Sequence, residues 1–179
     1  EAAPLLAALA DPGAGPFEMA PVPPETVRNF TALIEAGLAL MARHLPELRA
    51  EIDGIVHEIL LGHAPPGRPT EFDGASHYQF WGLLMLNPRH HRTPLAVVEV
   101  LAHEAAHSLL FGLTVTEPLV FNPDAELYPS PLRRDPRPMD GIYHATFVSA
   151  RMAWAMGRLA GAADLPEADR AAAAEAART

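Results

Sequence analysis

Residues 103–107 read His-Glu-Ala-Ala-His, a combination of residue types and spacing that suits a metal ion. On a helix, residues four positions apart lie on one face, so the imidazoles of His103 and His107 can reach the same ion. Glu104 lies beside them, and Glu99 extends this face by one turn, where a carboxylate can accept a ring N–H. Such polar groups are costly to bury in an apolar helix without a purpose. We therefore predict a metal centre on His103 and His107.

The two histidines need a further ligand. Catalytic zinc sites usually have three protein ligands plus water, and non-haem iron oxygenases use two histidines and a carboxylate. By position, the best third ligand is His144, in the first turns of the next expected helix, and Asp140 is the reserve. A metzincin requires glycine and histidine where this chain has Leu110 and Leu113, so that clan is excluded.

The motif falls in the helix with the clearest start in the sequence. Thr93 is a suitable N-cap, Pro94 suits the first helical position, and no breaker interrupts the residues up to Phe111. Apolar residues at spacings of three and four predict another helix over residues 24–45. A second long helix is expected from residue 139 or 140 to about 159, and it would present the third ligand.

The remaining segments give weaker patterns. Residues 48–61 fit either a helix or a strand, and the apolar run at 76–86 is typical of a strand covered on both faces. Residues 62–74 read as a loop, 114–138 as a long proline-rich irregular stretch of the kind that often carries function, and 1–10 as a short helix or frayed end. These patterns predict an α+β fold.

The expected architecture is a mostly helical single domain with a small sheet next to the motif helix, an arrangement that is zincin-like by fold-level analogy. Residues 1–165 would form the metal-dependent catalytic domain. Residues 166–179 would form an Ala-rich C-terminal helix or tail with few core contacts.

Composition limits the classes of function. The 179 residues carry a net charge of −9 and contain no cysteine, which disfavours binding to nucleic acid or an anionic membrane and excludes disulfides and thiolate ligands. Charged and polar side chains interrupt the most apolar stretch, residues 97–113, so no membrane span is expected. Residues 1–10 lack the basic region of a signal peptide. The chain is therefore expected to be a soluble, cytoplasmic protein.

Two segments carry a family resemblance. Residues 98–110 read VEVLAHEAAHSLL and residues 128–144 read YPSPLRRDPRPMDGIYH. They resemble the HExxH-type peptide β-hydroxylases, which are 2-oxoglutarate-dependent iron enzymes that modify ribosomally made peptides. The likeness covers roughly residues 75–155, with a weaker match at 25–45, and departs from the family at Leu132, where an aromatic residue is common. The positions that match the family pattern after the metal helix are Tyr128, Arg133, Asp135, Pro136, Arg137, Pro138, Gly141 and His144.

The resemblance implies a dioxygenase. His103, His107 and His144 would hold Fe(II), and 2-oxoglutarate and O2 would be consumed to hydroxylate a side-chain carbon, at Cβ, of a ribosomally made precursor peptide. A guanidinium binds a carboxylate with two parallel hydrogen bonds, so Arg137, or else Arg133, would bind the distal carboxylate of 2-oxoglutarate. Glu104 is not required as a base in this scheme. The competing interpretation of the two arginines is surface pairing with Asp135, Asp140 or Glu126.

Two other functions stay open. A zinc metallopeptidase would use Glu104 as the general base that deprotonates a metal-bound water, with Tyr128, Tyr143 or an arginine polarising the carbonyl. The motif alone favours this peptidase, and the segment from Arg133 to His144 favours the oxygenase. A non-catalytic metal-binding or peptide-recognition domain is the third possibility.

Overall fold

The elements of the fold are seen in a computed structural model, which describes residues 19–67, 72–130, 132 and 134–178. The helix or frayed end expected at residues 1–10 lies outside these ranges. The described chain forms one mostly helical α+β domain with a small mixed sheet. In chain order the elements are β1 (Ala20–Pro21), α2 (Pro24–His44), α3 (Pro46–Ile55), β2 (Glu58–His63), β3 (Gly74–Ser76), the 3-10 turn η1 (Tyr78–Phe80), β4 (Leu83–Leu86), α4 (Pro94–Leu113), β5 (Leu127–Tyr128), β6 (Arg137–Pro138), α5 (Met139–Ala160) and α6 (Glu167–Ala176).

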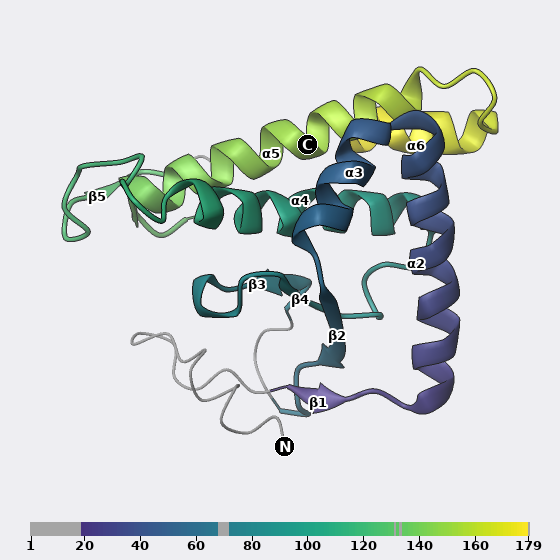
Figure 1. Cartoon of the computed structure of the whole chain (residues 1–179), viewed down its shortest axis with the longest axis horizontal. Coiled ribbons are helices and arrows are strands. Elements are labelled where there is room, and N and C mark those ends of the chain that lie inside the picture. Colours follow the sequence, from purple (N-terminus) through teal and green to yellow (C-terminus); the bar gives the residue numbers. More distant parts are fainter. Residues whose placement is uncertain (1–18, 68–71, 131, 133, 179) are drawn as a thin grey trace.

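Helix α4 is the centre of the domain. The Thr93 hydroxyl accepts a hydrogen bond from the Ala96 N–H at 3.1 Å, and Pro94 occupies the first turn, which confirms the predicted start. Figure 1 shows α4 lying between α5 and the sheet, with α5 running antiparallel to it. Because α4 is covered on several sides, apolar residues are found almost all round it.

Helix α2 confirms the helix predicted over residues 24–45, and it packs across the start of α4 (Figure 1). The two backbones approach closely at Gly37. A Cβ atom there would lie 2.9 Å from Val97 Cγ1 and 3.2 Å from the carbonyl oxygen of Pro94. Glycine at position 37 therefore allows α2 and α4 to cross at this short distance.

The sheet has the strand order β1-β2-β4-β3, with β2 parallel to β4 and β3 antiparallel to it. The continuous strand predicted over residues 76–86 is wrong, because η1 and a turn at Gly82 (φ 90°) interrupt it. The Trp81 indole N–H donates to the Ser108 carbonyl on α4 at 2.6 Å, which draws this part of the chain away from the sheet. Only β4 has the expected burial on both faces, with Leu84 and Leu86 facing the core.

The other segments follow the sequence in part. Residues 48–61, which fitted either structure, contain both, since α3 ends at Ile55 and β2 begins at Glu58. The described residues of the stretch 114–138 are irregular apart from the two-residue pair of strands β5 and β6. The second long helix is confirmed as α5.

The C-terminal segment forms helix α6, which packs along α5 (Figure 1). Ala173 is only 1% exposed and belongs to the hydrophobic core, so α6 has more core contact than its Ala-rich composition indicated. The division of the chain at residue 165 stays a prediction.

Among the described residues, α4 is the one helix long and apolar enough to span a membrane. Of its most apolar window, 56% is buried inside the domain. Core helices of soluble proteins have this property, and a cytoplasmic location stays a prediction.

The close crossing of α2 and α4 gives a stability test. Gly37→Ala should lower the free energy of unfolding by about 1–2 kcal/mol, because the added methyl group meets Val97 and the Pro94 carbonyl. The matched variant Gly54→Ala, in α3 with nothing within 4 Å of the added atom, should raise it by about 0.5–1 kcal/mol. Urea unfolding measures both variants, and equal stabilisation by the two would contradict the close approach.

Candidate metal centre

The antiparallel packing of α4 on α5 brings together two of the three predicted ligands. Nδ1 of His107 and Nδ1 of His144 lie 3.0 Å apart, and the two rings stack with centroids 5.3 Å apart and planes 18° apart. The Phe111 ring covers this pair, with its centroid 6.2 Å from that of His107 and 5.5 Å from that of His144. Two imidazoles from different helices therefore meet under an aromatic lid.

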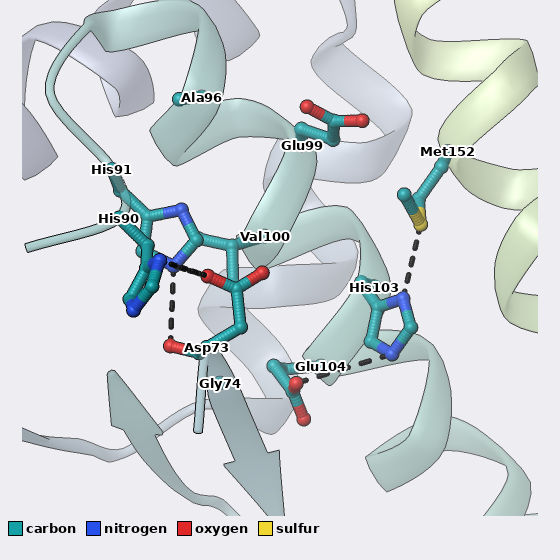
Figure 2. Close-up of a pocket in the computed structure, with 10 residues that line it drawn as sticks. All are labelled: Asp73, Gly74, His90, His91, Ala96, Glu99, Val100, His103, Glu104 and Met152. Carbon is teal, nitrogen blue, oxygen red and sulfur yellow. Dashed lines mark hydrogen bonds and ion pairs between the residues drawn. The ribbon is translucent and has the colours of Figure 1, made fainter. Parts of the chain in front are cut away.

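His103 lies one turn before His107 but faces a different neighbour. The two ring centroids are 5.0 Å apart, while His103 Nδ1 lies 3.0 Å from the sulfur of Met152 on α5. His103 Nε2 points towards Glu104, at 3.9 Å from Oε1 (Figure 2). Within the described ranges, no three His, Asp or Glu side chains converge closely enough as placed to hold one metal ion. A three-histidine centre requires His103 to turn from Met152 towards the other pair.

Burial keeps these histidines neutral. It lowers the pKa of His107 to about 3, helped by the charges that His103 and His144 would carry if protonated. Burial also lowers the pKa of His103 and of His144, against the opposing charges of Asp73 and Asp140. A metal binds the neutral imidazole, so protons compete weakly for these nitrogens near neutral pH.

The separation of His107 and His144 suits ligands of one ion. Metal–nitrogen bonds of about 2.1 Å that meet at a right angle place their nitrogens about 3 Å apart. The Nδ1 atoms lie at hydrogen-bond distance, and their separation of 3.0 Å is also compatible with this value. The charge and the spacing of the pair therefore fit a metal.

Glu104 is buried beneath strand β3, with 4% of its surface exposed. A Cβ atom on Gly74 would lie only 2.6 Å from Glu104 Oε1, so the strand passes directly over the carboxyl group. Burial raises the pKa of Glu104 to about 7; the Ser76 hydroxyl opposes this shift and the negative charge of Asp73 adds to it. Near neutral pH the group can both take up and release a proton, as a general base must.

The expected cosubstrate residues are placed less clearly. Arg137 Nε lies 3.0 Å from Asp135 Oδ2, an ion pair without good hydrogen-bond geometry, and this pairing is one of the surface alternatives expected for the arginine. Arg133 lies outside the described residues. The reserve ligand Asp140 is exposed, with its Oδ1 3.9 Å from His144 Nε2. The Tyr128 hydroxyl donates to Glu126 at 2.6 Å.

A cavity of about 430 Å³ opens on the His103 side of the motif (Figure 2). Its walls come from the start of β3, from the chain preceding α4, and from α4 and α5. Polar residues from all but α5 line it: Asp73, His90, His91, Glu99, His103 and Glu104.

Sequence reasoning missed several of the neighbours. Met152 lies two helical turns after His144, with buried Val148 between them, so helical spacing from His144 could have indicated it. Phe111 is four residues after His107 and could have been found in the same way. Asp73 and Gly74 carried no local signal, because their contact with α4 depends on how the sheet packs.

Neither the scan against family models nor the search of curated proteins finds a match to this chain. The function is therefore inferred from the geometry of the site and from the sequence motifs.

The buried carboxyl group of Glu104 predicts a pH-dependent stability. The folded, metal-free protein binds this proton more tightly than the unfolded chain, so the group costs stability as pH rises from 4.5 through about 7. Glu104→Gln should therefore be more stable than the wild type by up to about 3 kcal/mol near pH 8, with little difference near pH 4.

Urea unfolding between about pH 4 and pH 8 measures this difference. Glu35→Gln, an exposed change on α2, is the control and should stay parallel to the wild type at every pH. If the difference in unfolding free energy between Glu104→Gln and the wild type were also the same at every pH, the raised pKa of Glu104 would be contradicted.

Proposed function

We propose that this protein is an Fe(II)- and 2-oxoglutarate-dependent oxygenase that hydroxylates a peptide side chain, at Cβ, with His103, His107 and His144 as metal ligands. The observation that carries the proposal is the 3.0 Å approach of His107 on α4 to His144 on α5. It joins the motif helix to the segment that resembles the peptide β-hydroxylases. The peptide would be ribosomally made and hydroxylated during its maturation.

The chain's residues support this role in several ways. His107 and His144 supply neutral donors at a suitable spacing, and His103 stands next to them with a sulfur atom as its present neighbour. When bound, iron with 2-oxoglutarate supplies the power to oxidise an unactivated C–H bond. Phe111 covers the histidine pair and limits the access of water to it. Glu104 orients His103 or the substrate and is not required to move a proton.

Arg137 is the proposed partner of the distal carboxylate of 2-oxoglutarate. It is the first residue of β6, where it pairs with Tyr128 of β5, and it stands just before α5, the helix that carries His144. Its present partner Asp135 is exposed, and exposed ion pairs contribute little free energy, so another carboxylate can replace Asp135 at small cost.

An extended peptide can bind along β3. This strand lies at one end of the described strand order and passes over Glu104, and peptides commonly add to such sheet edges. An edge strand beside a metal helix is also what a zincin-like arrangement would have. The proposed peptide path therefore runs beside the motif.

A zinc metallopeptidase is the second candidate, and Glu104 favours it. The carboxyl group is buried next to His103, and its pKa of about 7 suits a general base for water. A peptide on β3 would then present a carbonyl to this base.

Metal titration tests the ligand set. His107→Ala and His144→Ala should each weaken binding of Fe(II), measured anaerobically, by about 100-fold or more, because each removes a ligand. His57→Ala, which removes an exposed histidine between α3 and β2, should bind as the wild type does. Unchanged affinity in His144→Ala would remove α5 from the centre and with it the proposed function.

Two further variants separate the reactions. Arg137→Ala should weaken 2-oxoglutarate about 10- to 100-fold, measured as KM in succinate release, through loss of a charged hydrogen-bonded pair. Arg158→Ala, exposed on α5, is the control.

Glu104→Gln should leave part of the succinate release intact in an oxygenase, whereas it should reduce zinc-dependent peptide cleavage by about 100-fold or more in a peptidase.

A further inference from the structure

The cavity beside His103 carries a marked charge asymmetry. Among the residues that the structure describes, its lining includes the carboxyl groups of Asp73, Glu99 and Glu104 and three histidines, but no arginine. Asp73 is exposed at the mouth, where its Oδ1 lies 3.3 Å from His91 Nε2, and Glu104 is buried in the floor. Ordinary surfaces intersperse both charge signs, and clefts lined by one sign attract ligands of the other. A cationic ligand fits this cavity better than an anion.

Glu99 is a carboxylate of this lining that is not one of the proposed metal ligands. It is half-buried on α4, one turn before His103, and among the described residues it makes no hydrogen bond or ion pair. Figure 2 shows it at the cavity with no interaction drawn to another side chain. Burying a carboxylate without a partner costs free energy, and a cation bound in the cavity would offset this cost.

The size and the apolar part of the lining indicate an organic cation. The volume of about 430 Å³ falls in the range of small-ligand sites. Ala96, Val100 and Met152 offer an apolar wall for a methylene chain, as long basic side chains require.

We propose that this cavity binds the basic side chain, lysine or arginine, of a residue in the peptide substrate, with Glu99 and Asp73 as its charge partners. This inference rests on the proposed peptide-modifying function and adds the substrate class. The same carboxylates repel acidic side chains, so the cavity selects peptides with a positive charge next to the position that is modified.

Binding tests this proposal without turnover. Short peptides that differ only at one position, lysine, arginine, norleucine or glutamate, are titrated onto the full chain at low salt. Lysine and arginine peptides should bind about tenfold or more tightly than norleucine, and the glutamate peptide least. Glu99→Gln should reduce the preference for lysine over norleucine about three- to tenfold, as expected for one partly buried ion pair. Glu35→Gln is the matched control.

Coupling by a carbodiimide locates the bound peptide. All thirteen basic residues of this chain are arginine, so its own side chains offer no amine to the reagent. An N-acetylated lysine peptide should form an amide with Glu99 or Asp73 in clear excess over the exposed Glu35, as mapped by mass spectrometry. Amides spread evenly over exposed carboxylates would overturn the proposal, and so would equal binding of the lysine and norleucine peptides.

The two proposals fail in different ways. Selective lysine binding without succinate release would keep the cavity's role and remove the oxygenase. Succinate release with no preference between lysine and norleucine would keep the oxygenase and remove the inference. If zinc alone protected Glu99 and Asp73 from carbodiimide coupling and the peptide did not, the cavity would be a metal site. That result would also overturn the inference of a basic side chain in the cavity.

Discussion

The packing of α4 between α5 and the sheet is the constraint on which the rest of the structure depends. Small residues make it possible, since Ala102, Ala105 and Ala106 are fully buried around the motif and let neighbouring elements approach closely. Once α4 is held in this way, His107 must face α5 and Glu104 must face β3. The polar groups of the motif are therefore presented on two different sides of one helix.

This burial has an electrostatic consequence. The same desolvation holds His107 neutral and raises the pKa of Glu104 towards neutrality, so the metal-free domain avoids unpaired charges in its interior. Neutral imidazoles and a carboxyl group poised near pH 7 are the forms that metal chemistry needs. A site with these properties is costly for stability, because an apolar helix with Leu at the same positions would pack without any desolvated polar group.

The sequence predicted those parts of the fold that depend on local signals. Thr93 and Pro94 define the start of α4, and helical periodicity defines α2. His144 is predicted as the partner of His107 by its position in the next expected helix, and that helix is α5. The strand over 76–86 was wrong because the bond from Trp81 to Ser108 and the turn at Gly82 reflect tertiary contacts that no local pattern records. For the same reason, the contact of β3 with Glu104 could not be predicted.

The two sides of the motif differ in charge, and this difference limits how an anionic cosubstrate can enter. A dicarboxylate placed in the cavity would meet Asp73 and Glu99 and would be repelled by both. His144 lies in the second turn of α5, which begins two residues after Arg137, and the ring that covers it is the uncharged Phe111. If the centre takes 2-oxoglutarate, the anion must therefore approach from the Arg137 side, which leaves the carboxylate-lined cavity to the peptide. Binding of the anion and the cation at different places would keep substrate and cosubstrate from competing for one pocket.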